Sequence, residues 1–184
     1  KAAKDRGRNR TEIYQDADES IIRRHTDVLV VQRLHSALAE NRFALFAQPI
    51  LPLSGDRGEP RFEMLLRMIA EDGEVLPPEK FLSAAERYQL LPEIDRWVVK
   101  NSLEALASCA RVLEGRGMQF SMNISGPSIA SEEFLQFLES SIRNSGIPPE
   151  TLCFELTETA AGSTPPEADG GAADGGAATR VVAA

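Results

Sequence analysis

The sequence has few cysteines, little positive charge and no long hydrophobic run. Its two cysteines, Cys109 and Cys153, are too few for a disulfide framework, so we expect two buried thiols in a reducing, cytoplasmic environment. No apolar run is long enough to span a membrane and no signal peptide is visible, although upstream segments of a longer parent protein could carry an anchor. The net charge of -8 disfavours binding to a nucleic-acid polymer, which requires many cations on one face, but leaves room for a small anionic ligand held through metal ions.

What is present is enough for one domain: 184 residues, of which 42% are hydrophobic. Four segments have the length and composition of β-strands, namely Phe43–Ile50, Arg61–Ile69, Phe120–Ser125 and Leu152–Glu158. Among their apolar residues stand Gln48, Glu63, Arg67, Asn123 and Glu155. Burying a lone carboxylate costs several kcal/mol, so such groups are normally paired or bound to a metal. Because all four segments share this irregularity, we predict that their polar side chains converge on one site.

Alternation along the segments separates an apolar face from a polar one, since successive strand residues point to opposite sides. In the second segment Glu63 and Arg67 alternate with Met64 and Leu66, and the third and fourth segments alternate in the same way. We therefore expect one face of the sheet to pack on helices and the other face to carry the polar groups.

Helical patterns fill the intervals between these segments. We expect one helix from about Asp18 to Asn41, a short one near Glu79, and a long one that Pro92 opens. An apolar stripe at helical spacing continues the long helix to Leu113, and the glycines that follow end it. From the second strand onward the order is strand, helices, strand, helix, strand, which implies parallel strands with right-handed crossovers.

The last helix and the two ends of the chain complete the prediction. Ser131 is expected to cap the start of a helix and Gly146 its end. Thr11–Gln15 has the composition of a short strand. The final segment, Ala160–Ala184, contains no aromatic residue, no Leu and no Ile, so we expect it to be disordered.

Several motifs, in their order and spacing, resemble the first half of an EAL domain, the bacterial phosphodiesterase of cyclic di-GMP. They are Gln48-Pro49-Ile50, Glu63-Met64-Leu65-Leu66-Arg67, the stretch FLSAAERYQLLPEIDRWVV, Met122-Asn123-Ile124-Ser125 and Glu155-Leu156-Thr157-Glu158. The resemblance runs from about Val31 to Thr159. Residues 1–15 resemble the closing turn and strand of a GGDEF (diguanylate cyclase) domain, through Ala3-Lys4 and Gly7-Arg8-Asn9-Arg10.

The resemblance implies an α/β fold, a modified TIM-like (β/α) barrel with its site at the carboxyl ends of the strands. It also implies hydrolysis of one phosphodiester of cyclic di-GMP to linear pGpG with Mg²⁺ or Mn²⁺. Hard divalent cations of this kind prefer oxygen ligands. The resemblance implies that Glu63, Asn123 and Glu155 are metal ligands and that Gln48, Leu65 and Arg67 contact the nucleotide. It implies that the catalytic residues are Glu63 and Glu158, of which Glu158 supports the metal ligands without binding the metal.

Simpler structural roles stand beside these assignments. Gln48, before Pro49, could cap the end of a strand. Arg67 could form an ion pair with Glu63 or Glu155 inside the barrel. Met64 occupies a position where the family usually has alanine, and its place on the helix-facing side indicates a packing role only.

The resemblance divides the chain into four parts: a GGDEF remnant at 1–15, a linker helix at 16–41, the N-terminal half of an EAL domain at 42–159, and an unrelated tail at 160–184. The second half of the family's domain, with its Asp-Asp pair and later lysine, has no counterpart here. The composition of the tail resembles the translation of a GC-rich gene in the wrong reading frame. About four strands of a barrel would then keep open sheet edges, which invite pairing with other chains.

We therefore expect a truncated barrel of the EAL type with little or no hydrolysis by this polypeptide. The alternatives are a non-catalytic cyclic di-GMP receptor or interaction domain, and a truncated product without a function. The expected partners are cyclic di-GMP and an upstream GGDEF domain in the parent protein, and homodimer formation stays open.

Overall fold

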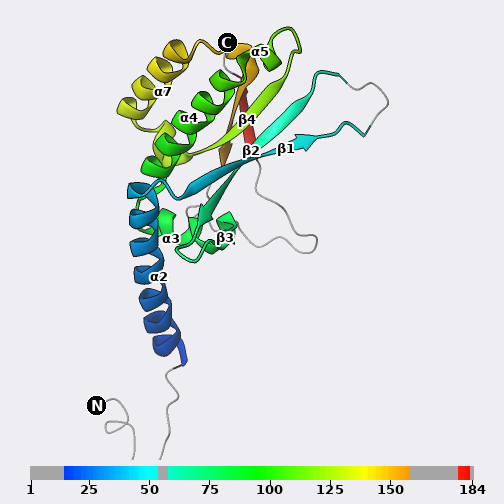
Figure 1. Ribbon diagram of the computed structural model, residues 1–184. Helices are drawn as coiled ribbons and strands as arrows, with labels where there is room; N and C mark the ends of the chain where they lie inside the picture. The colour runs from blue at the N-terminus through cyan, green and yellow to red at the C-terminus, as the bar shows by residue number, and fades with distance from the viewer. Residues whose placement is uncertain (1–14, 54–57, 158–177, 183–184) are drawn as a thin grey trace, which may run out of the picture.

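The computed structural model describes residues 15–53, 58–157 and 178–182 (Figure 1). Its centre is a mixed sheet with the strand order β1-β2-β4-β5-β6 and with β3 paired to β2. The strands are β1 (Phe43–Ile50), β2 (Arg61–Ile69), β3 (Val75–Leu76), β4 (Gln119–Ser125), β5 (Leu152–Thr157) and β6 (Ala178–Val182). β2, β4 and β5 are parallel neighbours, as the sequence predicted, while β1 and β2 form an antiparallel hairpin.

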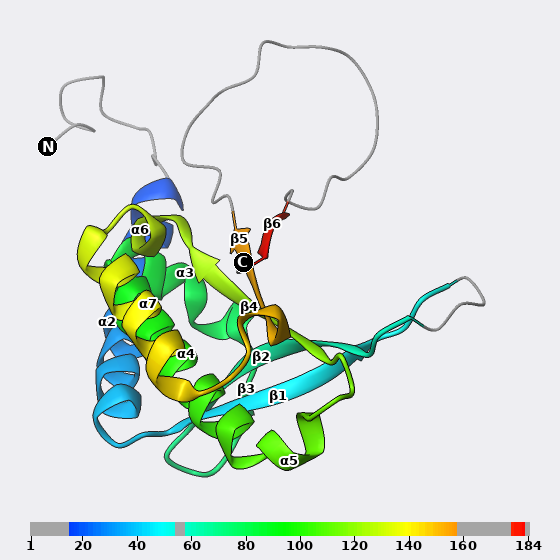
Figure 2. The ribbon, with the colours of Figure 1, turned by 90° about the horizontal axis from the view of Figure 1, so that it is seen from above.

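Helices cover one face of this sheet. They are α2 (Gln15–Ala39), α3 (Leu82–Arg87), α4 (Leu91–Ser108), α5 (Ala110–Leu113), α6 (Gly126–Ile129) and α7 (Glu132–Ser145), with single 3₁₀ turns at Pro78–Lys80 and Pro149–Thr151. α4 and α7 lie side by side along the sheet, and α2 extends away from it (Figures 1 and 2). The α/β class and the bounds of the first two predicted strands are confirmed.

The core lies between the sheet and these helices. Met64, Met122 and Phe154 stand in one row across β2, β4 and β5, and all three are buried. From the helix side, Val98 and Val99 of α4 belong to the same apolar cluster. The alternation predicted an apolar face toward the helices, and this face is where the core forms.

The caps predicted for α7 are present. The Ser131 hydroxyl accepts a hydrogen bond from the Phe134 amide at 3.3 Å, and Gly146 adopts φ 70°, the left-handed conformation that ends many helices. The long helix predicted to reach Leu113 is instead interrupted at Cys109, which separates α4 from α5. The Ser108 hydroxyl bonds back to the Ala105 carbonyl at 2.6 Å, and such local bonds compete with helix continuation.

Two strands were not predicted. β3 folds back from a turn to pair antiparallel with the end of β2. β6 pairs antiparallel with β5, so the prediction of disorder is wrong for Ala178–Val182; the open edge of β5 offers backbone groups, and two valines favour a strand. The rest of the predicted disordered segment, residues 160–177 and 183–184, lies outside the described residues.

The predictions at the N-terminal end and for the cysteines have mixed outcomes. Gln15 is the first residue of α2 rather than part of a strand, and the other residues of Thr11–Gln15 lie outside the described residues.

Cys153 is buried, but Cys109 is exposed at the junction of α4 and α5, so the expectation of two buried thiols is wrong for Cys109. Within the described ranges, no helix has the length and hydropathy to cross a bilayer.

Candidate functional site

Three of the predicted site residues meet on the sheet face opposite the helices. Glu63 on β2 pairs in register with Ser121, two positions before Asn123 on β4, and Asn123 pairs in register with Glu155 on β5. The Asn123 side-chain amide donates a hydrogen bond to Glu63 Oε1 at 2.8 Å. Directly paired residues on neighbouring strands have side chains that can touch. The register therefore gathers two carboxylates and one amide from three strands.

These side chains are only half-buried, so the expectation that their carboxylates are fully buried is wrong. Glu63, Asn123 and Glu155 all retain partial exposure to solvent. The helices cover the other face of the sheet, so the polar face does not desolvate its carboxylates fully. Of the predicted convergence, the contact between Asn123 and Glu63 and the register of Glu155 with Asn123 are present, and neither depends on a deeply buried charge.

The residues expected to contact a nucleotide lie on the same face. Gln48 is exposed on β1, in register with Glu63, and Leu65 is half-buried two residues further along β2. The Arg67 guanidinium donates to the Leu66 carbonyl at 2.7 Å and lies 5.6 Å from the centre of the Phe46 ring. Arg67 is thus held against the β1–β2 hairpin by an aromatic contact. Glu158 lies outside the described residues.

A cavity of about 370 Å³ lies between the sheet and the helices α3 and α4, and Asn123 is the member of the cluster that lines it. The β2–β4 ladder ends at the Met64–Met122 pair, while β2 continues alongside β1 and β3 to Ile69. Leu65 and Asn123 line the cavity from the carboxyl-terminal parts of the two strands. In parallel sheets, ligands bind in crevices at the carboxyl ends of strands that diverge in this way.

Sequence reasoning missed two acidic residues of this cavity, Glu86 on α3 and Asp95 on α4. Asp95 is buried and accepts three hydrogen bonds: from the Ser125 amide at 3.0 Å, the Ser125 hydroxyl at 2.6 Å and the Ser128 hydroxyl at 2.6 Å. Burial raises the pKa of the Asp95 carboxyl, and these three hydrogen bonds act in the opposite direction. A signal was available, because Asp95 stands four residues before Val99 on the apolar stripe of its helix.

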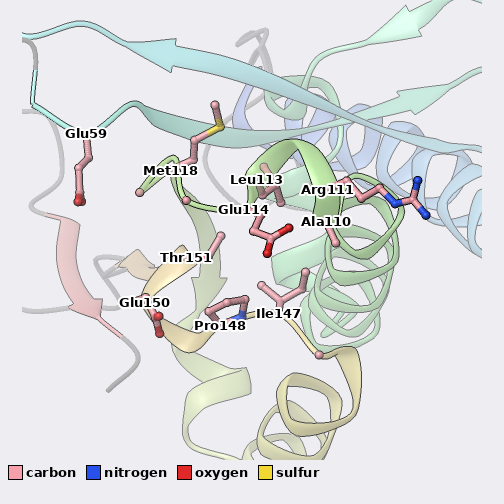
Figure 3. A pocket seen from close by; sticks show the side chains of 13 residues that line it. Glu59, Ala110, Arg111, Leu113, Glu114, Met118, Ile147, Pro148, Glu150 and Thr151 are labelled. Atoms are coloured by element: carbon pink, nitrogen blue, oxygen red, sulfur yellow. The ribbon is translucent and has the colours of Figure 1, made fainter.

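A second cavity, of about 580 Å³, lies at the opposite end of the parallel strands (Figure 3). Met118 and Thr151 border it just before β4 and β5 begin, and Glu59 borders it before β2. Glu114, which follows α5, and Glu150, in the same 3₁₀ turn as Thr151, also line it. This cavity contains none of the predicted site residues, and so the candidate site is confined to the cluster at Glu63 and Asn123.

The donor set suits a divalent cation in part. Two carboxylates and an amide oxygen are the ligand types that Mg²⁺ and Mn²⁺ prefer, and the contact between Asn123 and Glu63 shows that two of the three already meet. Across the described part of the chain, no group of three or more His, Cys, Asp or Glu residues is arranged to hold a metal ion. The residues present therefore fit part of a coordination sphere.

Comparisons with known proteins agree on one family. Residues 31–171 match the sequence profile of the EAL domain. The chain is 33% identical over 160 residues to cyclic di-GMP phosphodiesterase PdeB of Shewanella oneidensis; this alignment covers 87% of the chain and 18% of that relative. The chain thus spans less than a fifth of the curated relative's length.

Solved structures show the same fold. The FimX EAL domain of Pseudomonas aeruginosa, bound to c-di-GMP, is 33% identical with a TM-score of 0.60, over 69% of this chain and 49% of that one. The FimX EAL domain of Xanthomonas citri, in complex with c-di-GMP, is 28% identical with a TM-score of 0.59, over 78% and 53% of the two chains. These matches confirm an α/β architecture of the EAL barrel type over about half of the solved domains' length.

Proposed function

The chain belongs to the EAL domain family, and from that membership we propose that it is part of a phosphodiesterase domain that binds cyclic di-GMP. The observation that carries the proposal is the contact between Asn123 and Glu63, with Glu155 in register beside Asn123. Asn123 also lines a cavity that is large enough for part of a nucleotide. Hydrolysis of one phosphodiester to give pGpG is the reaction proposed for the intact domain.

EAL phosphodiesterases depend on divalent metal ions, and we propose that Glu63, Asn123 and Glu155 hold such an ion here. A bound Mg²⁺ or Mn²⁺ would neutralise phosphate charge and promote attack by water. Asn123 presents its amide nitrogen to Glu63, so ion binding requires the amide to turn its oxygen toward the cation. Glu63 and Glu155 supply the negative charge that attracts the ion.

Contacts to the dinucleotide are proposed for Gln48, Leu65 and Arg67. The Arg67 guanidinium is a planar donor suited to a phosphate, and the Phe46 ring limits its motion. Gln48 is exposed beside Glu63, where its amide can reach a ligand that bridges β1 and β2. Leu65 provides apolar surface at the mouth of the cavity, against which a base can pack.

The domain organisation proposed from the sequence supports a signalling role. An upstream GGDEF domain, closing at residues 1–15, would be joined through a linker helix at 16–41 to the EAL half-domain at 42–159. α2 spans most of that linker and extends away from the sheet (Figure 1). Glu158 is proposed to support the metal ligands, and a second copy of the chain is proposed as a further partner.

A binding role without turnover is the second candidate for this polypeptide. It is favoured by the partial donor set, because the described residues contain no cluster of three or more His, Cys, Asp or Glu that could hold a metal. Two-metal phosphodiester chemistry requires ligands on both sides of the reacting phosphate. We therefore expect this chain to bind cyclic di-GMP and to hydrolyse it slowly or not at all.

Calorimetric titration with cyclic di-GMP, with and without Mn²⁺, tests the proposal, with chromatography of the products as a parallel readout. Binding of cyclic di-GMP that requires Mn²⁺ supports the proposal. Robust hydrolysis of cyclic di-GMP would show that the chain is an enzyme rather than a receptor without turnover. Glu63→Gln should abolish the Mn²⁺-dependent part of binding. The matched control is Glu59→Gln, which removes an exposed carboxylate just before β2, at the rim of the second cavity. Failure of the folded wild-type chain to bind the dinucleotide would refute the proposal.

A further inference from the structure

The carboxylate of Asp95 is the most heavily hydrogen-bonded side chain near the site, yet it faces Ser125 and Ser128 rather than the open sheet face. We propose that Asp95 is a positioning residue, which fixes the end of β4 and thereby holds Asn123 against Glu63. The inference rests on the proposed function in so far as Asn123 is assigned a role in ligand binding. Asp95 itself is not among the residues that would touch the ion.

The geometry of β4 supports this role. Ser125 is the last residue of β4, two positions after Asn123, and it is buried where its hydroxyl meets Asp95 of α4. Asp95 Oδ2 accepts from both the amide and the hydroxyl of Ser125, which fixes the backbone and the side chain of that residue together. Only a few backbone dihedral angles separate Asn123 from Ser125. Fixing the position of Ser125 therefore also limits the direction in which the Asn123 side chain points.

Ser128 adds a second hydroxyl to the anchor. Its hydroxyl donates to Asp95 Oδ2 at 2.6 Å, and its oxygen lies 3.1 Å from that of Ser125. Ser128 lies on α6, the short helix that follows β4, so three elements converge on one carboxylate oxygen. Hydrogen bonds to a carboxylate are shorter and stronger than neutral ones, and buried networks of this kind restrict motion when every member is satisfied.

Asp95 also links this anchor to the core. Its helix neighbours Ile94 and Val98 are buried in the apolar cluster under the sheet, so the carboxylate is carried by a rigid element. The β2–β4 backbone ladder ends at Met64–Met122, before Asn123, so from Asn123 to the end of β4 the strand pairs with β5 and not with β2. The Asp95 network supplies a restraint at the point where that pairing stops. Groups that orient a metal ligand in this way typically change metal affinity by about 10- to 100-fold when removed.

Ser128→Ala and Ser102→Ala form a matched pair for the test. Both serines are fully buried, and Ser102 is on α4, but its hydroxyl has no hydrogen-bond partner among the described residues. Each variant loses one buried oxygen, and only Ser128→Ala loses a bond to Asp95. Circular dichroism first establishes a temperature at which both variants are folded.

The first readout needs no ligand: the NMR chemical shift and order of the Asn123 side-chain amide. We expect a shifted and broadened signal in Ser128→Ala and an unchanged one in Ser102→Ala. An unchanged Asn123 signal in folded Ser128→Ala overturns the inference, whatever the binding data show.

The second readout is affinity for cyclic di-GMP in Mn²⁺, expected to weaken by about tenfold in Ser128→Ala. If the Asn123 signal moves while affinity stays unchanged in a chain that binds, the positioning role in binding is wrong. If the wild type does not bind at all while the signal moves, Asp95 still positions Asn123, and it is the proposed function that fails.

Discussion

Met122 is the residue whose truncation should damage the half-barrel most clearly. It is fully buried at the centre of the parallel sheet, with Met64 and Phe154 beside it in the same row. Met122→Ala leaves a cavity between two strands and the helix layer. Substitutions of this type cost about 2–5 kcal/mol, and the position between two buried neighbours predicts a value of about 3 kcal/mol.

Urea unfolding provides the measurement. With a denaturant slope of about 2 kcal/mol per M, a loss of about 3 kcal/mol lowers the urea midpoint by about 1.5 M. Circular dichroism follows the secondary structure, and the single tryptophan, Trp97, reports the helix layer because its ring lies 5.3 Å from that of Phe43. The two signals should change together, since the sheet and α4 share one core.

Met118→Ala is the control for the same chemical change. Met118 is half-buried just before β4, so its truncation should cost less than about 1 kcal/mol. Equal midpoints for the two variants would refute the reasoning, because they would show that the row of Met64, Met122 and Phe154 does not form the core of the fold. Separate transitions for the two probes would show instead that α4 and the sheet unfold independently.

Three further predictions concern the caps and the buried carboxylate. Ser131→Ala should lower the free energy of unfolding by about 1 kcal/mol, while Ser140→Ala on the exposed side of α7 should change it little; equal losses in urea unfolding would contradict the cap. Gly146→Ala should also cost about 1 kcal/mol, because alanine is strained at φ 70°, and an unchanged thermal midpoint would argue against that conformation. Burial raises the pKa of Asp95 in the folded state above its ordinary value of 3.8, so its contribution to stability is largest below 3.8 and falls as pH rises toward the folded pKa. The stability difference between wild type and Asp95→Asn should therefore decrease with pH above 3.8, and a difference that increases with pH would show that the folded pKa is lowered instead.

Local patterns in the sequence were sufficient to place several elements. The run FALFAQPI and the run RFEMLLRMI have the bounds that the structure gives to β1 and β2. Ser131 and Gly146 fixed the two ends of α7, because a cap depends on a few consecutive residues. The assignment of Glu63, Asn123 and Glu155 to the polar faces of their strands also followed from local information, because side chains alternate along a strand.

Features that depend on contacts between distant residues were not predictable in the same way. The break between α4 and α5 arises at Cys109, inside a stripe that continues at helical spacing. β3 and β6 are strands because partners elsewhere in the chain offer an edge to them. The partial exposure of Glu63 depends on which face the helices cover, and no local pattern measures that coverage.

The sequence by itself determined the family, the parallel strands and the identity of the oxygen-bearing residues, because these follow from motif order and from alternation over a few neighbouring positions. Only the tertiary structure decided that Asn123 contacts Glu63, that β2 and β4 part beside them, and that Asp95 secures the end of β4. Strand register and helix packing set those distances, and both are fixed by the fold of the whole core rather than by any single segment.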